Sequence, residues 1–400
     1  MRWLVIDIGR LERRLGRAAP TGVDRVILAY ARELERRFPE RTCFVRTAFG
    51  RIIPYSRARA ARILDLTESN WATGARDVPG RVSTVLARVQ DYARAAAIGG
   101  LKKPFVFFSL DHNGLEEKGA VWRSKQQAEN RAVVFLHDLI PLTHPEYVVP
   151  ATEQKHRQRM RSMAGHADLV IANSSYTQDE FARYLGKANL PEPNTMVAWL
   201  GAQPHWQENG RSPGVERPYF VVLGTIEARK NHVLILSVWR HLAERLGPEA
   251  PVLHVVGRRG WEAEAAVDML ERCPALKPCV VEHANMADKD LVPLVHNARA
   301  LLFPSFVEGF GLPLVEALGS GIPVIASDIP VFREIAGNIP DYTDALDGPG
   351  WERLIEAYCD ADSPARAAQL QRIASFDPPS WDDHFKTVLP HITDLVEHPG

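Results

Sequence analysis

The chain has 400 residues, which exceeds the length at which one hydrophobic core usually stops growing, so two domains are expected. Its 46% apolar and 24% charged residues are typical of a folded globular protein, and no low-complexity tract interrupts them. No apolar run approaches the ~20 residues of a membrane span, and the opening MRWLVIDIGR is too briefly apolar for a secretion signal, so we expect a cytoplasmic protein.

The net charge is close to zero, but the charges are unevenly placed. Residues 1–200 carry 31 Lys and Arg against 21 Asp and Glu, and the remaining residues carry 17 against 28. A basic half can face an anionic membrane, a phosphate-bearing acceptor or nucleic acid. The alternative is that the two halves simply have solvent-exposed surfaces of opposite charge, which gives the same numbers without a partner. The basic half lacks interleaved aromatic residues and any known nucleic-acid module, so no nucleic acid is expected as a partner.

In the first half, short strand-like runs alternate with helical stretches. The expected strands span 3–8, 42–48, 104–109, 132–138 and 168–174. The expected helices span 23–38, 153–165 and 176–186. This alternation predicts parallel strands joined by crossover helices.

The alternation stops at 201–218, which is rich in Gly, Pro and polar groups and is typical of a linker. It then resumes. The expected strands of the second half span 219–224, 251–257, 279–283, 300–305 and 322–327. The expected helices span 231–247, 261–273, 288–298 and 312–320. The sequence therefore predicts an α/β protein of two doubly wound domains, with a cleft lined by the carboxyl ends of strands.

The stretch PSFVEGFGLPLVEALGSGIPVIASD, residues 304–328, places two glutamates around a Gly-Phe-Gly turn. Gly309 and Gly311 allow a turn with uncovered amides at the start of a helix, which suits a phosphate or a sugar hydroxyl. Glu308 and Glu316 are eight positions apart, about 12 Å along a helix. That exceeds the ~5 to 9.5 Å of glycosidase carboxylate pairs, so these carboxylates would hold separate parts of one long ligand. A surface glutamate and a helix-capping glutamate fit the spacing equally well.

The segment EGFGLPLVE resembles the E-x7-E signature of retaining GT-B glycosyltransferases, the glycosyl transferases group 1 or family 4 set. LGTIEARKNHVLIL, VVGRRGW and SGIPVIASDIPVFREIAG are similar to further segments of that family's donor domain. TGVDRV, FLHDLIPL and ANSSYTQDEF resemble its acceptor domain more loosely, and SFDPPSW resembles the segment before its final helix.

This resemblance implies the GT-B architecture, in which two Rossmann-like domains face each other across a cleft. The implied acceptor-binding domain spans 1–205, and the nucleotide-sugar-binding domain spans 206–378. A C-terminal helix within 379–400 is expected to pack back on the N-terminal domain.

The resemblance also implies roles in the second half. Glu308 would contact hydroxyls of the donor sugar, and Glu316 the ribose hydroxyls of the nucleotide. Arg229 and Lys230 would neutralise the diphosphate leaving group; an exposed helix start is the alternative for this pair. The expected donor-binding residues are Gly22, Gly224, Thr225, Arg229, Lys230, Gly257, Arg258, Asn285, Met286, Glu308, Gly309, Phe310, Gly311, Leu312 and Glu316.

One position departs from the family pattern. Many relatives carry Arg directly after the glycine that corresponds to Gly224, and this chain has Thr225. Either Arg229 and Lys230 supply the positive charge alone, or Arg258 or Arg259 contributes.

In the first half, His137 and Asp138 follow a strand and so lie at its carboxyl end. The histidine that matches His137 in relatives lies close to the reacting sugar, so the expected catalytic residues are His137, Glu308, Arg229 and Lys230. Asp111, His112 and Asp138 are the expected acceptor-binding residues. Gly22 is expected in a loop before the first long helix.

No metal and no cofactor beyond the nucleotide-sugar co-substrate is expected. Asp288 and Asp290 spell a DxD pair, but they fall at an expected helix start, where acidic residues are common. The four cysteines are too widely spread for a zinc or redox pair. The G-x4-GK[ST] phosphate loop is absent from the sequence.

The resemblance implies a retaining, metal-independent hexosyltransferase of bacterial surface glycan synthesis. GTIEARKN looks most like mannosyltransferases, which suggests GDP-mannose as donor and a lipid-linked or polysaccharide acceptor. The alternatives are a UDP-sugar-dependent transferase of the same family and a non-catalytic nucleotide-sugar-binding protein. With a lipid-linked or surface polysaccharide acceptor, the basic first half would rest on the anionic inner membrane face. The arginines expected to make this contact are Arg10, Arg13, Arg14, Arg17, Arg57, Arg59 and Arg62.

Overall fold

The computed structural model describes residues 1–17, 20–97, 101, 104–116, 119–125, 129–203, 217–284 and 286–397. The chain forms two compact units. The first comprises Met1–Leu139, Gln154–Leu200 and Trp381–Gly400, and the second comprises Ile140–Glu153 and Gly201–Ser380. The segment Ile140–Glu153 lies within the range 1–205 that the sequence predicts as one domain, yet it is grouped with the second unit.

The first unit is built on a seven-stranded sheet in the order β3-β2-β1-β4-β5-β6-β7. The strands are β1 (Trp3–Asp7), β2 (Thr42–Ala48), β3 (Arg51–Pro54), β4 (Phe105–Ser109), β5 (Arg131–Leu136), β6 (Leu169–Ala172) and β7 (Thr195–Val197). Only the β2–β3 pair is antiparallel within this sheet. β4 is buried along its whole length, because helices cover both faces of a doubly wound sheet.

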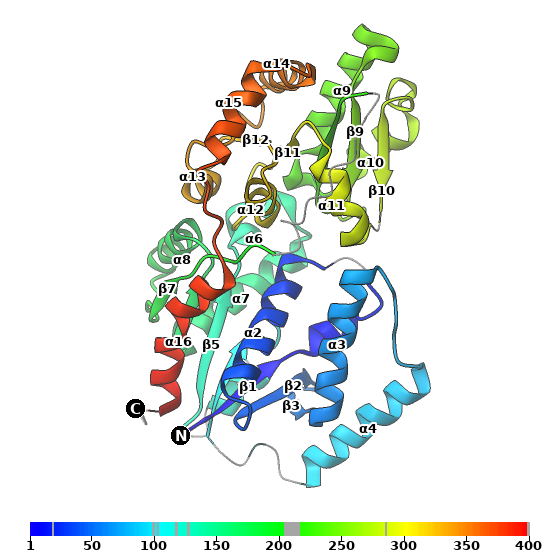
Figure 1. The fold of residues 1–400 in the computed structure, drawn as a ribbon. Coiled ribbons are helices and arrows are strands. Elements are labelled where there is room, and N and C mark those ends of the chain that lie inside the picture. The colour runs from blue at the N-terminus through cyan, green and yellow to red at the C-terminus, as the bar shows by residue number, and fades with distance from the viewer. Residues whose placement is uncertain are drawn as a thin grey trace. The chain divides into compact units, whose positions relative to one another are not determined.

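The helices of the first unit include several that the sequence predicts. They are α1 (Gly9–Arg14), α2 (Gly22–Arg37), α3 (Arg57–Thr73), α4 (Arg81–Ala97), α5 (Ala120–Lys125), α7 (Pro150–His166), α8 (Ser175–Ala188) and α16 (Trp381–Glu397) (Figure 1). The helix expected at 23–38 is α2. A capping box between Thr21 and Asp24 starts it, and an apolar face that includes Val26 and Tyr30 packs into the core.

The second unit has a six-stranded, all-parallel sheet in the order β10-β9-β8-β11-β12-β13. Its strands are β8 (Tyr219–Leu223), β9 (Val252–Val256), β10 (Val280–His283), β11 (Leu301–Phe303), β12 (Val324–Ser327) and β13 (Asp341–Thr343). Its helices are α6 (Ile140–Thr143), α9 (His232–Leu246), α10 (Glu264–Arg272), α11 (Asp288–His296), α12 (Leu312–Gly319), α13 (Pro330–Ala336), α14 (Gly348–Cys359) and α15 (Pro364–Ile373).

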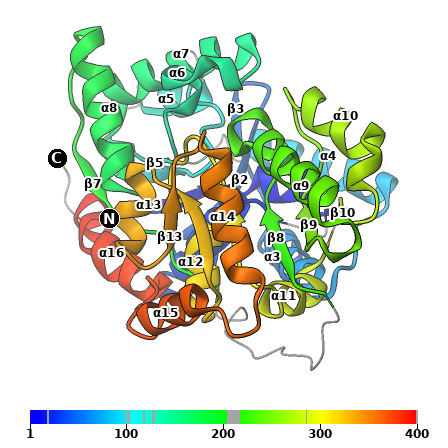
Figure 2. The ribbon, with the colours of Figure 1, turned by 90° about the horizontal axis from the view of Figure 1, so that it is seen from above.

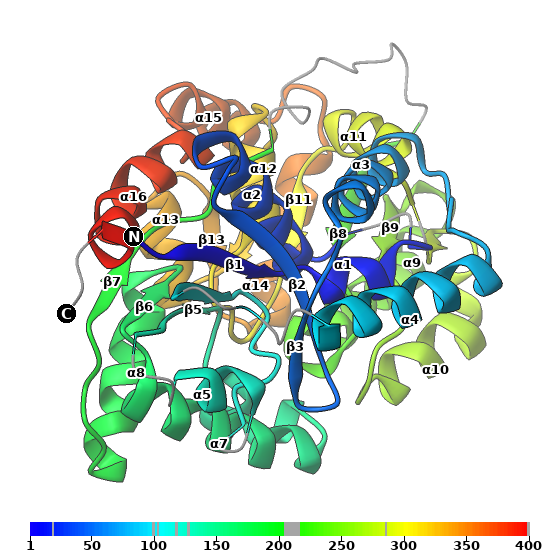
Figure 3. The ribbon, with the colours of Figure 1, turned by 90° about the horizontal axis from the view of Figure 1, so that it is seen from below.

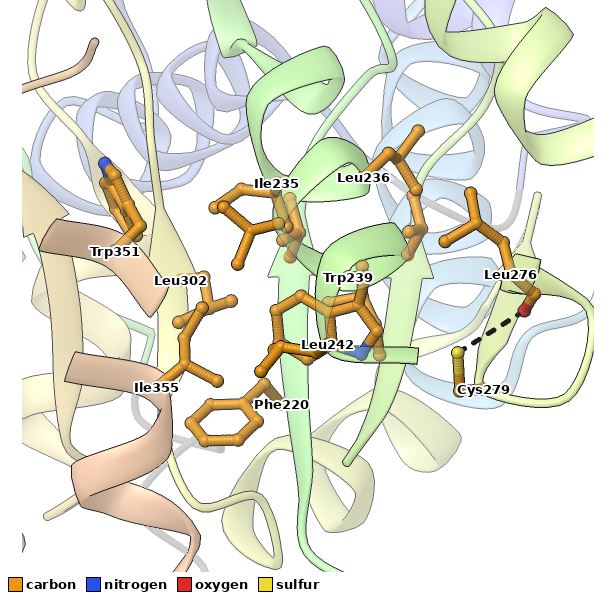
Figure 4. Close-up of a cluster of buried hydrophobic side chains, with 14 of the residues drawn as sticks. Phe220, Ile235, Leu236, Trp239, Leu242, Leu276, Cys279, Leu302, Trp351 and Ile355 are labelled. Carbon is orange, nitrogen blue, oxygen red and sulfur yellow. Dashed lines mark hydrogen bonds between the residues drawn. The ribbon is translucent and has the colours of Figure 1, made fainter. Parts of the chain in front are cut away.

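One hydrophobic cluster fixes α9, α10 and α14 on the second sheet. Trp239 of α9 and Trp351 of α14 are fully buried in it together with Phe220 of β8 (Figure 4). α9 and α14 lie next to each other, as Figure 2 shows from above. Burial of two tryptophans and their neighbours stabilises this layer strongly, since each aromatic side chain removes about 150–250 Å² from water.

Each sheet contains one point at which the strand order reverses. In the first sheet it falls between β1 and β4, and in the second between β8 and β11. Crossover connections leave these two neighbouring strands in opposite directions, so their carboxyl ends are not covered by a connecting segment. In doubly wound sheets, ligands bind at this position. The two reversal points therefore direct the search for functional residues.

Candidate functional site

The carboxyl ends of β8 and β9 approach each other closely in the second unit. The amide of Gly224 donates to the carbonyl of Val256 over 2.9 Å, and a Cβ on Gly257 would lie 1.7 Å from the carbonyl oxygen of Gly224. Gly224 itself has a φ of +142°. Glycine is therefore required at 257 by the close approach and is favoured at 224 by its backbone conformation.

Five side chains meet where β8 and β11 end, next to the reversal point, and we call them the Glu308 cluster: Glu227, Arg229, Lys230, Ser305 and Glu308. Nη1 of Arg229 lies 2.8 Å from Oε2 of Glu308, and Lys230 pairs with Oε1 of the same carboxylate. The Ser305 hydroxyl donates to that Oε1 over 2.8 Å. Nε of Arg229 also lies 2.7 Å from Oε1 of Glu227. Two chain segments almost 80 residues apart thus form one polar site.

The Glu308 cluster is mostly buried, and Glu308 at its centre is held in its charged form. Burial alone would raise the pKa of Glu308, but Arg229 and Lys230 outweigh it and hold this pKa at about 2. Burial lowers the pKa of Lys230, and Glu308 opposes that shift. Burial raises the pKa of Glu227, against the influence of Arg229 and Lys230. Glu308 therefore fixes two cations at a strand end, where a ligand with negative charge can approach.

Arg229 and Lys230 do not form the exposed helix start that was the alternative for them. They lie in a short 3-10 turn, Ala228–Lys230, and Asn231 with a φ of +56° separates that turn from α9. Their side chains are only 22% and 11% exposed. Because α9 begins at His232, the helix expected from residue 231 starts one residue later.

The glycine turn that follows Glu308 leads into α12 as predicted. Gly311 is the N-cap residue with a φ of +111°, and a Cβ there would lie 2.9 Å from the Phe332 ring. Phe310 and Leu312 are buried. The first amides of a helix have no partner within the helix, so this end of α12 favours negative or hydroxyl oxygen.

Glu316 lies in the second turn of α12 and is buried, with 4% of its surface exposed. Glu308 is likewise buried, at 6% exposure, so the alternative of a surface glutamate just before the helix is wrong.

The remaining predicted donor residues lie near the same strand ends but outside the cluster. Thr225 is half-buried and contacts the turn at Gly260, while Arg258 is exposed. Arg259 pairs with Glu282 at 2.9 Å and with Glu271, so its charge is already balanced. Met286 is half-buried. Asn285 lies outside the described residues.

Sequence reasoning missed several residues of this site. Glu227 and Ser305 carry no motif of their own, although the LGTIEARKN segment contains the first. Phe306 stacks on Tyr147 of the Ile140–Glu153 segment with ring centroids 5.7 Å apart, and Nε1 of Trp261 donates to the Tyr147 carbonyl over 3.2 Å. These ring contacts lie one residue from Ser305, and no spacing pattern predicts them.

In the first unit, the reversal point carries two buried carboxylates. Asp7 ends β1 and accepts from the amide of Gly9 at 2.8 Å and from the Thr47 hydroxyl at 2.6 Å. Asp111 follows β4 and accepts from the amide of Asn113 at 3.0 Å. Burial raises the pKa of both, and the charge of Asp7 adds to the shift of Asp111. Of these two carboxylates, only Asp111 is among the site residues expected from the sequence.

Three histidines lie beside these carboxylates, and with Asp7 and Asp111 we call them the strand-end group: His112, His137 and His156. The Nε2 atoms of His112 and His137 lie 2.7 Å from the carbonyls of Phe135 and Leu110. Nε2 of His156 lies 3.2 Å from the carbonyl of Asp138. A carbonyl only accepts, so each ring carries a proton on Nε2 and leaves Nδ1 as an acceptor when neutral.

Burial lowers the pKa of each of these three histidines, and their mutual charges add to the shift of His112. The rings of His112 and His137 are 5.5 Å apart, and those of His112 and His156 are 5.7 Å apart. The predicted residues Asp111, His112 and His137 are thus brought together. Asp138 is half-buried, and its backbone carbonyl lies 3.2 Å from Nε2 of His156.

Gly22 does not lie in a loop, as the sequence suggested, but is the first residue of α2. Asp24 in the same turn binds Nε of Arg10 at 2.6 Å and Nε of Arg14 at 2.8 Å. Two of the arginines expected to face a membrane are therefore paired with one buried carboxylate. The capping box explains the shift of the helix start, since it makes Thr21 the cap.

Within the described part of the chain, no group of three or more His, Cys, Asp or Glu side chains is arranged to hold a metal ion. None of the helices described is both long enough and apolar enough to cross a membrane.

Residues 207–340 match the family described as Glycosyl transferases group 1. The serotype-specific mannosyltransferase WbdA of Escherichia coli is 32% identical over 222 residues, which is 51% of this chain and 27% of WbdA. The O-antigen chain mannosyltransferase B of Escherichia coli is 26% identical over 264 residues, 63% of this chain and 68% of that protein. The chain thus spans about a quarter of the length of WbdA.

Solved structures extend the likeness to the whole fold. Anabaena Alr3699/HepE in complex with UDP-glucose has a TM-score of 0.67 at 16% identity, covering 98% of this chain and all of that one. WaaG, a glycosyltransferase involved in lipopolysaccharide biosynthesis, has a TM-score of 0.60 at 14% identity, covering 98% and 99%. At such identities the likeness establishes the fold, which is the GT-B architecture expected from the sequence.

Proposed function

We propose that the chain is a glycosyltransferase, because residues 207–340 match the glycosyl transferases group 1 family and the fold is GT-B. It moves a sugar from a nucleotide diphosphate to an acceptor hydroxyl. The observation that carries the proposal is the Glu308 cluster, which holds two cations at the reversal point of the second sheet.

The second unit binds the donor in this proposal. Arg229 and Lys230 contact the diphosphate, and the N-terminal amides of α12 face its oxygens. Glu308 keeps the two cations in place and reaches hydroxyls of the sugar, while Glu316 binds the ribose. Since two preorganised cations need no rearrangement when the leaving group gains charge, they stabilise the transition state more than the ground state.

The reaction proceeds with retention of the anomeric configuration. The bond between the anomeric carbon and the phosphate oxygen breaks, and the acceptor oxygen forms a new bond from the same face. The acceptor's proton passes to the departing phosphate. No protein nucleophile and no metal takes part, because the cations of the Glu308 cluster supply the positive charge that a metal would otherwise give.

The first unit binds the acceptor. Neutral histidines and carboxylates with raised pKa values exchange hydrogen bonds with hydroxyls without needing a charged ligand. Asp111, His112, His137 and Asp138 are the residues assigned to this role.

Mannose from GDP-mannose is the proposed donor, and a lipid-linked or polysaccharide acceptor of bacterial surface glycan synthesis is the proposed substrate. The names of WbdA and of the O-antigen chain mannosyltransferase B support this choice. A UDP-sugar donor is the competing assignment.

A thermal-shift panel of GDP, UDP, ADP and their sugars tests the proposal. A ligand that binds the folded chain raises its melting temperature, and GDP with GDP-mannose should give the largest shifts. Release of GDP from GDP-mannose without acceptor then separates an enzyme from a non-catalytic binder. A chain that responds to none of these nucleotides at millimolar concentration is not a glycosyltransferase of this kind.

A further inference from the structure

Three aromatic rings stack on one another in the second unit beside the Glu308 cluster, and we call them the Tyr147 stack: His144, Tyr147 and Phe306. The centroid of the Tyr147 ring is 5.9 Å from that of His144 and 5.7 Å from that of Phe306. The ring planes differ by only 8° and 9°. Offset stacking of this kind is a preferred arrangement of aromatic pairs, so the three side chains hold one another in place.

The Tyr147 stack joins two segments of the second unit that are far apart in the sequence. His144 and Tyr147 lie on Ile140–Glu153, where a 3-10 turn follows α6. Phe306 lies on the loop between β11 and α12. Nε1 of Trp261, which follows β9, donates to the carbonyl of Tyr147 over 3.2 Å and ties the turn to a third segment. The position of the Tyr147 ring is therefore fixed from its own side as well as by Phe306.

The backbone around Phe306 is the framework of the Glu308 cluster. β8 and β11 are neighbours in the second sheet, as Figure 3 shows from below, so the loop after β11 meets the turn that carries Arg229. The amide of Phe306 donates to the carbonyl of Arg229 over 2.9 Å. The Ser305 hydroxyl donates to Glu308, and Nη1 of Arg229 donates to the carbonyl of Val307 over 3.2 Å. A displacement of Phe306 would therefore disturb these polar contacts together.

The polar contacts of this loop depend on Arg229 and Lys230, which are bound to Glu308. In the proposed function a diphosphate binds the same two cations and competes with Glu308 for them. The ring contact between Tyr147 and Phe306 does not involve these charges, so the diphosphate leaves it intact. Precise placement matters here, because a misplacement of about 1 Å near the reacting groups can slow a reaction about 10²-fold.

We propose that Tyr147 is a positioning residue of the Glu308 cluster: its ring holds Phe306 and, through Phe306, the loop that carries Glu308. This role rests on the proposed function and extends it to a residue outside the family match at 207–340. The alternative is that the ring only fastens the Ile140–Glu153 segment. That alternative predicts no change at the amide of Phe306 and no change in kcat when the ring is removed.

Four proteins test the proposal: the wild type, Tyr147→Leu, Tyr147→Phe and the control Phe376→Leu. Leucine removes the stacking ring, whereas phenylalanine keeps it. Phe376 is a half-buried residue just after α15, so the control loses a ring elsewhere in the second unit. Hydrogen exchange of the unliganded chain follows the amide of Phe306, and the kcat for GDP release from GDP-mannose with acceptor follows the chemistry.

In Tyr147→Leu the amide of Phe306 should exchange roughly fivefold faster, because one contact that keeps the loop closed is lost. Its kcat should fall about tenfold. Tyr147→Phe and the control should match the wild type in both measurements. Unchanged exchange at Phe306, or faster exchange with an unchanged kcat, overturns the proposal. So does a Tyr147→Phe protein that is as impaired as Tyr147→Leu, since the ring would then not be the group that matters.

The exchange measurement needs no substrate, so it separates this proposal from the proposed function. If the wild type binds no nucleotide, the proposed function fails, and the exchange rates alone decide whether Tyr147 holds the loop. If Tyr147→Leu does not fold by circular dichroism, Phe306→Leu removes the other ring of the pair, and the same two measurements apply to it. Exchange and kcat equal to those of the wild type would then overturn the proposal.

Discussion

The two sheets place carboxylates at the same topological position, but the pKa values of these carboxylates shift in opposite directions. At the β8–β11 reversal, the pKa of Glu308 is lowered to about 2. At the β1–β4 reversal, burial raises the pKa values of the carboxylates in the strand-end group. Arg229 lies 2.8 Å from Glu308 and Lys230 pairs with it as well, whereas Arg13 lies 3.8 Å from Asp111. The closeness of the cations thus decides which way burial and charge together shift the pKa.

The largest expected effect comes from removing the charge at the centre of the Glu308 cluster. Glu308→Gln keeps the shape of the side chain but releases Arg229 and Lys230 from their common partner. Transfer at saturating donor should slow by about 10² to 10³-fold, a size typical for loss of one electrostatic contact to the transition state. The kcat for GDP release from GDP-mannose with acceptor measures this.

Glu244→Gln is the matched control, because Glu244 forms an exposed ion pair with Arg240 on α9. Its kcat should equal that of the wild type. A Glu308→Gln protein with full activity would remove Glu308 from the mechanism.

A second test asks whether the charges of Lys230 and Glu308 contribute cooperatively to the unfolding free energy. Lys230→Met leaves buried Glu308 with one cation fewer and should cost about 3 kcal/mol of unfolding free energy. Lys230→Met combined with Glu308→Gln should cost less than the sum of the two single changes, since the pair is then removed together. Urea unfolding of the four proteins measures this coupling. Strictly additive costs would mean that the two charges are screened from each other.

The close approach of β8 and β9 provides a steric test. A methyl group at Gly257 would lie 1.7 Å from the Gly224 carbonyl, so Gly257→Ala should push the two strand ends apart and cost about 1–3 kcal/mol. Gly186→Ala on α8 is the control, because nothing lies within 4 Å of the added methyl and alanine favours the helix. Differential scanning calorimetry should give a lower melting temperature for the first variant only.

Glu316→Ala separates nucleotide binding from chemistry. Loss of a carboxylate that holds ribose hydroxyls should weaken GDP binding by about tenfold and change kcat little, because ribose contacts are the same in ground and transition states. Calorimetric titration with GDP gives the affinity. Unchanged affinity together with a large loss of kcat would reverse the roles assigned to Glu308 and Glu316.

The first unit should respond to mild acid, whereas Glu308 should not. His112 has a pKa well below 6.5 in the folded chain, because burial disfavours its charged form. The unfolded chain therefore binds the extra proton first, and stability is lost as pH falls below 6.5 toward the folded-state pKa. In urea unfolding between pH 6.5 and 5, His112→Asn should reduce the slope by about 1 kcal/mol per pH unit.

Asparagine suits this site because His112 has a φ of +61°, which asparagine tolerates. Glu308 should add acid sensitivity only between about pH 4.5 and 2, since its lowered pKa keeps it ionised above that window. An identical slope in wild type and His112→Asn would show that this histidine is not held neutral.

The sequence predicts local features of this fold well. The apolar spacing from Val23 onward predicts α2 to within one residue, and the glycine turn before Leu312 predicts α12. These signals are short-range, because a turn and a periodicity each depend on a few neighbouring residues. The alternation of strands and helices predicts two doubly wound α/β domains, and the resemblance implies the GT-B architecture.

Contacts between distant segments are harder to predict. Glu227 and Ser305 enter the site because β8 and β11 are neighbours in the second sheet, and strand order is not encoded in any local pattern. The strand-end group arises in the same way. His156 lies on α7, more than 40 residues along the chain from His112, and the two rings come together only in the folded protein. No helix was expected over 81–97, and α4 meets its unit through Asp91 with Arg59 and Arg88 with Glu12, which are distant in the sequence.

Calorimetric titration of GDP into the wild type and into Lys230→Met tests the central claim most directly, namely that the cations held by Glu308 bind a nucleotide diphosphate. The account predicts measurable binding to the wild type and at least a roughly tenfold weaker affinity for the variant, the loss of one charge-assisted contact to phosphate. Equal affinities for the two proteins, or no binding of GDP, UDP or ADP to the wild type, would contradict it.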